Sequence, residues 1–489
     1  MTRRIGICRR LGVVVFLLAV ALGLGANLWA QPSEDFRKHP SPPPKHPNII
    51  FILADDLGYG ELGCYGQTQI LTTNLDRLAR EGMRFTSCYA GSTVCAPSRA
   101  ALMTGLNTGH VRIRGNKKIP LSPEDLTLGE FLKAANYNTC ALGKWGLGDE
   151  GSTGMPRLQG FDEWFGYLNQ VEAHDYYPVL LNRSDLTSER NVEVSENLNG
   201  AKGKYSDDYF TEAALNYIRM MKPKWYTVNL PYFLYLAYTI PHANDELGAK
   251  TGNGMEVPED APYSNQPWPQ VEKNKASMIT RLDRYVGTLL DTMKEAKTDT
   301  NTIIIFTSDN GPHKEGGVNP KFFHASGPLR GIKRDLYEGG IRVPMIVWWP
   351  GKIKAGTVSD LPVAFWDILP TVAGIAEKPA PGNIDGISFL PTLLGQAQTN
   401  RHEFLYWEFH ENGFKQAVRM GNWKGVRFGV DGPLELYNLK TDIGETKNVA
   451  AENAPIVAKI EEYLKTARTE DTNWPALTAA KTKKTEYGK

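Results

Sequence analysis

Residues 48–58 read NIIFILADDLG, an apolar run that ends in two adjacent acidic residues. The consecutive aliphatic and aromatic side chains of residues 48–54 are typical of a strand buried on both faces of a parallel sheet. Residues 302–307 (TIIIFT) repeat this pattern, and Asp309 and Asn310 follow shortly after them. Because ligands bind beyond the carboxyl ends of strands in open α/β sheets, the two polar turns predict a site at one edge of the sheet.

Three further apolar runs predict strands at residues 139–142, 232–238 and 345–349. Between them, apolar side chains recur at helical spacing and predict helices over residues 127–136 and 277–297. Strands that alternate with helices indicate an α/β fold with a large, mostly parallel central sheet flanked by helices.

The pattern changes near residue 395. Residues 404–409, 416–428 and 434–439 predict short antiparallel strands joined by Gly-rich turns, and a helix is expected after Pro455. This part of the chain is therefore predicted to form a small α+β subdomain with an antiparallel sheet.

These changes in pattern predict the domain organisation. A main domain is expected over residues 47–395, the subdomain over 396–468, and a loose, Lys-rich polar tail over 469–489. Residues 1–30 combine four Arg with a short apolar run and small residues, the pattern of a signal peptide, and residues 31–46 resemble an extended linker. A membrane anchor is the alternative, but the run is short and no stop-transfer charges follow it. We expect an exported protein, periplasmic or secreted, without stable membrane insertion.

The composition excludes several classes of protein. The 489 residues contain 55 Lys and Arg and 54 Asp and Glu, and 41% are hydrophobic, so neither a disordered chain nor a nucleic-acid-binding surface is expected. Four Cys lie outside the predicted signal peptide, and their spacing matches neither a zinc site nor a dense disulfide framework.

Two polar pairs, Asp55-Asp56 and Asp309-Asn310, each leave a predicted core strand. A set of oxygen ligands without His suits a hard cation, Ca²⁺ or Mg²⁺, better than zinc. Either pair alone is equally well explained as a turn or helix cap. Two such pairs at the ends of two strands favour a metal site.

Residues 95–105 read CAPSRAALMTG and place Cys95 at the start of a predicted helix, where backbone N–H groups favour anions. A buried structural thiol is the simpler interpretation. A phosphatase-like cysteine is excluded because that arrangement needs Arg six positions later, where Ala101 lies. A thiolate prefers softer metals, so Cys95 should not act as a thiol if it joins the acidic site.

This segment resembles the C-x-P-S-R signature of the type I sulfatases, of the alkaline phosphatase superfamily. Other segments resemble the same family in the same order, and the likeness covers roughly residues 46–467. They are residues 55–60 (DDLGYG), 143–145 (GKW), 308–312 (SDNGP), 329–333 (LRGIK), 337–344 (YEGGIRVP), 434–439 (LELYNL) and 444–446 (GET).

The resemblance implies an alkaline-phosphatase-like fold and a role for each matching residue. A maturation enzyme would convert Cys95 to formylglycine, whose hydrate is an oxygen nucleophile compatible with a hard cation. Calcium would be bound by Asp55, Asp56, Asp309 and Asn310 together with residue 95. Arg99 would hold the diol, Lys144 and Lys333 would contact the sulfate oxygens, and His242 would protonate the leaving alcohol or share that work with Lys333.

One position departs from the family pattern. The family sequence G-K-W-H-L-G reads here GKWGLG over residues 143–148, so Gly146 replaces a His that contacts formylglycine. His174, His313 and His324 are candidates to replace its function. His174 also lies in a Tyr-rich segment and is a candidate substrate contact.

The sequence thus predicts an exported, calcium-dependent sulfatase that cleaves sulfate esters, expected on carbohydrates, at the S–O bond. Two alternatives stay open: a phosphate or phosphonate ester hydrolase on the same fold, and an inactive protein that binds sulfated glycans.

Overall fold

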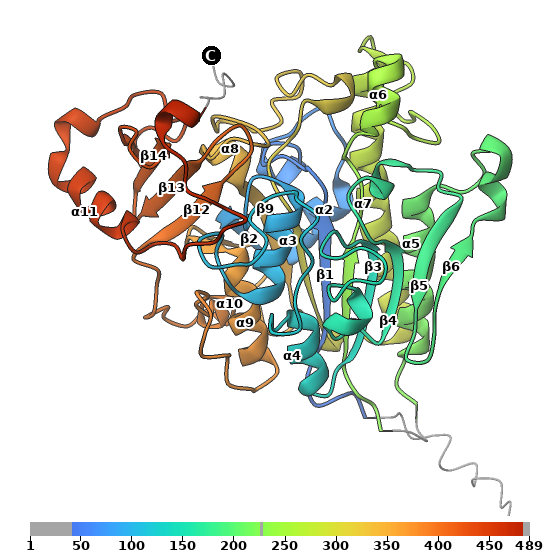
Figure 1. Ribbon diagram of the computed structural model, residues 1–489. Coiled ribbons are helices and arrows are strands. Elements are labelled where there is room, and N and C mark those ends of the chain that lie inside the picture. Colours follow the sequence, from blue (N-terminus) through green and yellow to red (C-terminus); the bar gives the residue numbers. More distant parts are fainter. Residues whose placement is uncertain (1–41, 225–227, 483–489) are drawn as a thin grey trace, which may run out of the picture. The chain divides into compact units, whose positions relative to one another are not determined.

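A computed structural model describes residues 42–224 and 228–482 (Figure 1). The predicted signal peptide and most of the predicted linker lie outside the described residues. Among the described residues, 42–43, 223–224 and 228–229 belong by their contacts to one unit, and residues 44–222 and 230–482 form a separate compact unit. Among the described residues, no helix is both long and apolar enough to cross a membrane.

An eleven-stranded sheet forms the centre of this unit in the described part of the chain, in the order β10-β2-β9-β8-β1-β7-β3-β4-β5-β6, with β11 beside β2. The strands are β1 (Asn48–Ala54), β2 (Met83–Tyr89), β3 (Asn138–Lys144), β4 (Glu163–Tyr167), β5 (Leu180–Ser184), β6 (Glu189–Glu193), β7 (Tyr232–Ala237), β8 (Thr302–Ser308), β9 (Arg342–Trp348), β10 (Thr357–Ser359) and β11 (Val363–Ala364).

The middle of the sheet is parallel, as predicted. Strand β1 pairs in parallel with both β7 and β8, and β3 pairs in parallel with both β7 and β4. The strand predicted over residues 345–349 begins at Arg342 and runs antiparallel to both β8 and β2. Strand β9 therefore carries the chain away from the edge at which β1 and β8 end.

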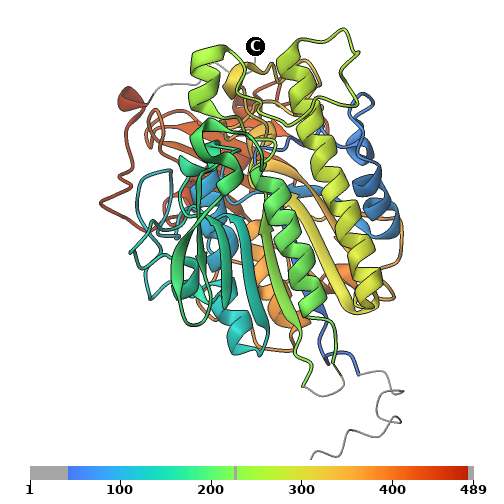
Figure 2. The same cartoon turned by 90° about the vertical axis from the view of Figure 1, so that its right-hand side faces the viewer.

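Alternate side chains of β1 explain why the strand is apolar throughout. Ile50 and Ile52 pack in one core with α2 (Thr73–Glu81), α5 (Ser206–Met220) and α7 (Gln270–Ala296). Ile49, Phe51 and Leu53 pack in a second core with α3 (Cys95–Thr104), α4 (Leu128–Ala134) and α9 (Ile368–Ile375). Both faces of the sheet are therefore covered, and Figure 2 shows α5 in green and α7 in yellow-green lying across the first face.

Helix α7 begins seven residues before the start expected from its apolar pattern. Two charged residues of its first turns are buried: Lys275 forms an ion pair of 2.6 Å with Glu61, and Glu272 accepts a hydrogen bond from the Asn319 backbone. The spacing of apolar residues gives no sign of these polar contacts, so it placed the start of the helix too late. The remaining short helices are α6 (Asp245–Thr251), α8 (Glu338–Ile341) and α10 (Leu390–Leu393).

The C-terminal subdomain contains a four-stranded antiparallel sheet and the helix α11 (Ala454–Leu464). Its strands are β12 (Leu405–Phe409), β13 (Lys415–Met420), β14 (Trp423–Phe428) and β15 (Glu435–Asn438). The region predicted as one strand over residues 416–428 is a hairpin, because Gly421 adopts a positive φ of 58° and reverses the chain.

The predicted loose tail is wrong for residues 469–482. The Trp474 side chain is 2% exposed, and its indole Nε1 donates a hydrogen bond of 2.9 Å to the Arg112 carbonyl. The Thr469 backbone is bonded in turn to Gly109 and Arg114. A single buried aromatic residue fixes this otherwise polar segment.

Candidate active site

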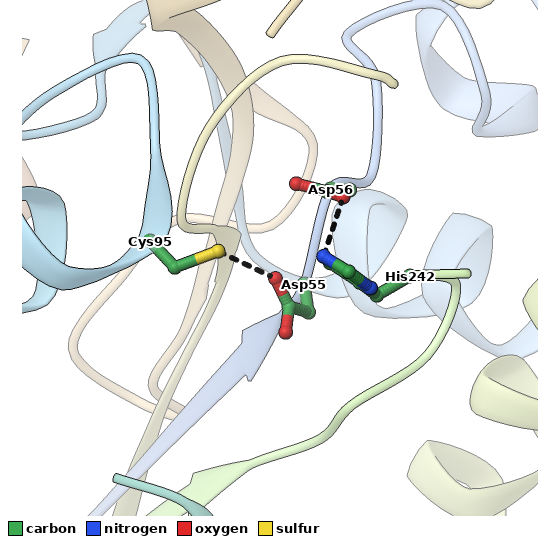
Figure 3. A group of neighbouring side chains, drawn as sticks. All are labelled: Asp55, Asp56, Cys95 and His242. Carbon is green, nitrogen blue, oxygen red and sulfur yellow. Dashed lines mark hydrogen bonds and ion pairs between the residues drawn. The ribbon is translucent and has the colours of Figure 1, made fainter. Parts of the chain in front are cut away.

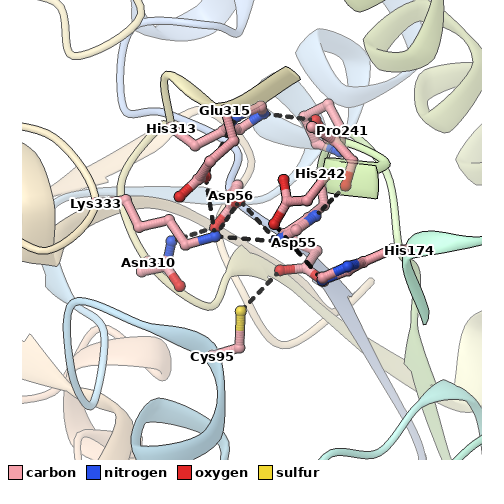
Figure 4. Close-up of polar contacts among 12 residues, drawn as sticks. Asp55, Asp56, Cys95, His174, Pro241, His242, Asn310, His313, Glu315 and Lys333 are labelled. Carbon is pink, nitrogen blue, oxygen red and sulfur yellow. Dashed lines mark hydrogen bonds and ion pairs between the residues drawn. The ribbon is translucent and has the colours of Figure 1, made fainter. Parts of the chain in front are cut away.

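Functional side chains from distant parts of the sequence meet at the carboxyl edge of the parallel strands (Figures 3 and 4). The backbone N–H of Asp309 donates to the Ala54 carbonyl over 3.1 Å, so the ends of β1 and β8 lie together. Asp55 and Asp56 follow β1, Asp309 and Asn310 follow β8, Lys144 ends β3, and His242 lies on the loop after β7.

Cys95 is the first residue of α3 and is 2% exposed. Its Sγ lies 3.3 Å from Oδ1 of Asp55 (Figure 3) and 3.4 Å from Nζ of Lys144. Lys144 Nζ also donates to Oδ2 of Asp55 over 2.5 Å. Residue 95 therefore lies between a carboxylate and an ammonium group.

Arg99 lies one helical turn after Cys95 and is completely buried. Its Nε and Nη2 both donate to Oδ2 of Asp309, over 3.1 and 2.9 Å, and its Nη1 donates to the Lys144 carbonyl over 2.6 Å. The planar guanidinium group thus fixes Asp309 and Lys144 relative to α3.

Lys333 lies on the opposite side of the cluster and is 5% exposed. Its Nζ donates to Oδ2 of Asp56 over 2.8 Å and to Nε2 of His242 over 3.0 Å (Figure 4). The Nδ1 atom of His242 is 2.7 Å from the Ala243 carbonyl, so Nδ1 carries the ring proton and Nε2 is the acceptor. Lys333 therefore holds the proton shared by this pair.

Burial and neighbouring charges shift the pKa values of the acidic groups and of the thiol in this cluster. Burial alone would raise the pKa of Asp55, but the positive charges of Lys144, Arg99 and Lys333 lower it below the usual range. Burial raises the pKa of Asp309 to about 7, and the neighbouring Asp55 adds to the increase. Burial, with Asp55 nearby, also raises the pKa of the Cys95 thiol well above its usual value. An unmodified Cys95 is therefore a protonated, weakly reactive thiol.

The oxygen atoms of this cluster fit a hard cation. One carboxylate oxygen each of Asp55 and Asp56, the Sγ atom of Cys95 and a ring nitrogen of His242 all lie within 4.8 Å of one another, and an aldehyde hydrate at residue 95 would replace the sulfur by oxygen. Asn310 donates through Nδ2 to Oδ1 of Asp56 over 2.6 Å, and its buried Oδ1 has no hydrogen-bond partner in the described part of the chain. A buried amide oxygen without a donor, next to carboxylates, is a group that a bound Ca²⁺ or Mg²⁺ would satisfy.

Gly146 has a φ of 79°, and a Cβ atom built on it would lie 2.2 Å from Nε2 of Gln170. The Gln170 side chain thus occupies the space next to this backbone, and its buried Oε1 has no hydrogen-bond partner among residues 42–224 and 228–482. No feature of the sequence identified Gln170, because it lies on a separate loop after β4.

Two of the three candidate His lie beside His242 (Figure 4). The His174 ring stacks on His242 with centroids 5.0 Å apart, and its Nδ1 lies 3.0 Å from Oε2 of Glu246. The buried His313 ring stacks at 5.8 Å, and its Nε2 lies 3.0 Å from the Pro241 carbonyl. His324 is exposed and lines a separate cleft.

Other residues that the sequence analysis missed support the His242 loop. Buried Asp207 accepts hydrogen bonds from Thr239 N and Oγ1, over 2.9 and 2.7 Å, and Tyr176 donates to the His242 carbonyl over 2.5 Å. Glu315 accepts from Lys333 over 3.3 Å. These contacts join residues far apart in sequence, but Tyr176 lies in the Tyr-rich segment of His174, and Glu315 lies five residues after Asn310.

Comparisons with known proteins agree over most of the chain. A family model described as Sulfatase matches residues 47–378, and one described as N-sulphoglucosamine sulphohydrolase, C-terminal, matches residues 332–470. The N-acetylgalactosamine-6-sulfatase of Sus scrofa is 33% identical, over 83% of this chain and 76% of that protein. The N-acetylgalactosamine-6-O-sulfatase of Bacteroides thetaiotaomicron is 29% identical, over 86% and 93%.

Solved structures with the same fold include Ps i-CgsB, with a TM-score of 0.71, 30% identity, and coverage of 86% of this chain and 93% of that one. A second structure holds Ps i-CgsB in complex with k-i-k-neocarrahexaose, with a TM-score of 0.71, 29% identity, and coverage of 88% and 96%.

Proposed function

Because this chain belongs to the sulfatase family, and is thus a sulfuric ester hydrolase, we propose that it cleaves sulfated carbohydrates at the S–O bond through formylglycine made from Cys95. The observation that carries the proposal is the position of Cys95. It begins α3 within 3.4 Å of both Asp55 and Lys144, and burial keeps its thiol protonated. An aldehyde hydrate at this position supplies an oxygen nucleophile where a thiol would be inert.

The first step attacks sulfur. One hydroxyl oxygen of the hydrated aldehyde loses its proton, which is the proton that net hydrolysis releases to solvent, and bonds to sulfur while the bond from sulfur to the alcohol oxygen breaks. Lys144 and Lys333 contact the sulfate oxygens and stabilise their charge. Arg99 keeps Asp309 and Lys144 in position relative to α3. The fixed, buried positions of these cations mean that little reorganisation accompanies the reaction.

The leaving alcohol receives its proton from the pair formed by Lys333 and His242. Lys333 holds the shared proton, and the Nδ1 contact of His242 with Ala243 keeps Nε2 directed at the ammonium group. When Lys333 gives its proton to the alcohol oxygen, the hydrogen bond between Lys333 and His242 holds both groups in position for the transfer.

The second step uses the same pair in the opposite sense. After the alcohol has left, Lys333 with His242 removes the proton from the remaining hydroxyl, the aldehyde C=O forms, and the carbon–oxygen bond to sulfate breaks. Water then hydrates the aldehyde again. The ligand atoms of His242 and Cys95 lie within 4.8 Å, which supports this role for the pair in a chain with Gly146.

Calcium is the proposed metal. Asp55, Asp56, Asp309 and Asn310 would hold it, together with the oxygen of residue 95, because they form a hard, all-oxygen set. When bound, the ion would supply positive charge that stabilises the sulfate oxygens.

The substrate class follows from the relatives. The name N-acetylgalactosamine-6-sulfatase refers to a sulfated sugar, and the Ps i-CgsB complex holds an oligosaccharide, a neocarrahexaose. His174 is the proposed substrate contact, because it is partly exposed beside His242. Export to the periplasm or outside the cell is proposed from the N-terminal pattern, as is a partner enzyme that matures Cys95.

The test is sulfate release from a panel of sulfated monosaccharides and oligosaccharides by protein made in a maturation-competent host. Cys95→Ala is the control for the nucleophile. Peptide mass determines whether Cys95 has become the aldehyde, and phosphate esters of the same alcohols are run in parallel.

Release of sulfate from one class of substrate, lost in Cys95→Ala, is the expected result. Faster hydrolysis of the phosphate esters would instead favour the phosphoesterase. Absence of turnover by a chain with the aldehyde in place, but with tight binding of a panel member, would favour the inactive glycan-binding protein.

A further inference from the structure

Glu315 is a half-buried acidic residue beside the active site, and the proposed mechanism gives its carboxylate no role. It lies on the loop after β8 and points toward Lys333 (Figure 4). Its Oε2 accepts a hydrogen bond of 3.3 Å from Lys333 Nζ, and its Oε1 accepts one from Nη1 of Arg334. Burial opposes the ionised form, but the charge of Lys333 lowers the pKa of Glu315 to about 2. Glu315 is therefore a carboxylate at neutral pH.

The ammonium group of Lys333 has three N–H donors, and each of them has an acceptor in the structure. The acceptors are Oδ2 of Asp56 at 2.8 Å, Nε2 of His242 at 3.0 Å and Oε2 of Glu315 at 3.3 Å. A sulfate oxygen that binds Lys333 must therefore take the place of one acceptor. The contact with Glu315 is the longest of the three, and Glu315 keeps its ion pair with Arg334 when that contact is lost. A sulfate bound at Lys333 thus lies next to an ionised carboxylate.

Arg334 does not cancel the charge of this carboxylate. Its Nε donates to Oε2 of Glu411 over 2.9 Å, so one guanidinium group is shared between two acids. Glu315 and Glu411 carry two negative charges and Arg334 one positive charge, which leaves one negative charge in this group. The Nδ1 atom of His313 lies 3.6 Å from Glu315, but its Nε2 proton is directed to the Pro241 carbonyl at 3.0 Å. The neutral His313 ring therefore adds no positive charge.

The backbone of Arg334 is held in place on the side of the nucleophile. Its φ of 75° is a conformation that residues other than glycine keep only where the surroundings enforce it. Its N–H donates to the Thr93 carbonyl over 3.1 Å, two residues before Cys95, and its own carbonyl accepts from Lys415 Nζ over 3.3 Å. Arg334 thus fixes the carboxylate of Glu315 relative to residue 95.

Charge, rather than shape, separates the two kinds of ester that this site could take. A sulfate monoester and a phosphate monoester of the same alcohol are both tetrahedral and similar in size. The sulfate ester carries one negative charge, whereas the phosphate ester carries two once the pH exceeds its second pKa of about 6. Because Coulomb energy is proportional to charge, a fixed carboxylate repels the dianion about twice as strongly as the monoanion.

We propose that Glu315 is a specificity-determining residue, whose negative charge disfavours dianionic phosphate monoesters and so favours monoanionic sulfate esters. The inference rests on the proposed function, which places the sulfate at Lys333, and extends it to the choice between the two esters. Discrimination of this kind acts by repelling the competitor rather than by an added contact with the substrate. A phosphate diester, which is a monoanion, does not meet the additional repulsion.

The experiment separates the charge of Glu315 from its contacts. Glu315→Gln removes the charge and keeps the shape of the side chain, whereas Glu315→Asp keeps the charge and shortens the reach toward Lys333. Glu461→Gln is the matched control, because it removes the same charge from an exposed position on α11 in the C-terminal subdomain. A purely structural role of Glu315 would change the results for all substrates alike.

Three probes share one leaving group: para-nitrophenyl sulfate, para-nitrophenyl phosphate, and methyl para-nitrophenyl phosphate, a diester. At about pH 8 the second probe is a dianion and the other two are monoanions. Their affinities are measured by calorimetry, with each variant combined with Cys95→Ala, and kcat/KM is measured with the matured enzyme. Glu315→Gln should raise the affinity for the phosphate monoester relative to the sulfate by about tenfold. The ratio of diester to sulfate should stay within about twofold of the Glu461→Gln value, and Glu315→Asp should keep the wild-type discrimination.

An unchanged ratio of phosphate monoester to sulfate in Glu315→Gln would overturn the proposal. So would an equal change for all three probes, which indicates a structural role, or an equal gain for both phosphates, which excludes charge as the cause. Failure of the proposed function has a different signature: the matured enzyme hydrolyses no sulfate, while the affinities measured with Cys95→Ala still show the effect of Glu315→Gln. Absence of binding by all three probes would overturn both.

Discussion

Removal of divalent cations should lower the thermal stability of this protein together with its activity. Asp55, Asp56 and Asp309 are completely buried within one cluster, and none of the described residues forms a hydrogen bond with the Oδ1 atom of Asn310. Without a cation, the mutual repulsion of the carboxylates and the unsatisfied amide oxygen remain in the folded state. The unfolded chain does not have this cost, so a cation that binds the native cluster stabilises the fold.

The size of the effect follows from linkage. Calcium at a thousandfold excess over its Kd stabilises the native state by about 4 kcal/mol. The compact unit has about 440 residues, and an unfolding entropy of about 2.1 cal/mol/K per residue then gives a shift in Tm of roughly 4–5 °C.

The assay is thermal unfolding, followed by scanning fluorimetry, of protein in a chelator and after addition of Ca²⁺ or Mg²⁺. Asn310→Ala removes the unpaired oxygen and should reduce the shift produced by the cation. Because each variant is compared with itself, the hydrogen bond from Asn310 to Asp56 lost by the substitution does not affect the comparison.

The reasoning is refuted if neither cation changes the Tm of the wild-type protein, or if Asn310→Ala gives the full wild-type shift. A response to Zn²⁺ but not to Ca²⁺ or Mg²⁺ would contradict the assignment of a hard cation.

Three further predictions concern single side chains. Lys144→Ala should lower kcat by about 10²–10³-fold in steady-state assays, because the buried ammonium group of Lys144 is preorganised beside residue 95. An unchanged kcat would show that Lys144 does not contact the sulfate. For His402, burial opposes the charged form, but the ion pair of 2.6 Å with Asp367 raises the pKa above its usual value. The wild type should thus have a larger free energy of unfolding than His402→Gln below about pH 6.5, and this difference should be lost as the pH rises through the elevated pKa. Denaturant unfolding at about pH 6 and at about pH 9 measures the difference. A difference that is larger at the higher pH would contradict the prediction. Trp474→Ala should reduce the free energy of unfolding by about 3–5 kcal/mol in denaturant titrations, and a change below about 1 kcal/mol would mean that the segment after residue 469 is not anchored as described.

Much of the fold was predictable from short segments. The apolar run of residues 48–54 matches β1 residue for residue, and residues 302–307 match all but the last residue of β8. A strand buried on both faces is apolar at every position, so its sequence alone reveals it. Helix α7 was harder to predict because its first turns carry Lys275 and Glu272, which are buried through polar contacts.

The candidate site was predictable where its residues directly follow core strands. Asp55, Asp56, Asp309 and Asn310 needed only the rule that parallel strands end at a common edge. Gln170 and Asp207 were not predictable, because each acts on the site from a loop or helix whose own sequence carries no sign of the contact.

The sequence by itself therefore determined five strands of the central sheet (β1, β3, β7, β8 and β9), the acidic pairs and the place of Cys95 at a helix start, since these features depend on neighbours within a few residues. Only the tertiary structure decided that Gln170 occupies the space beside Gly146, that His174 and His313 flank His242, and that Trp474 anchors the end of the chain. Such contacts join segments tens to hundreds of residues apart, and they are decided by the close packing of side chains rather than by any local periodicity.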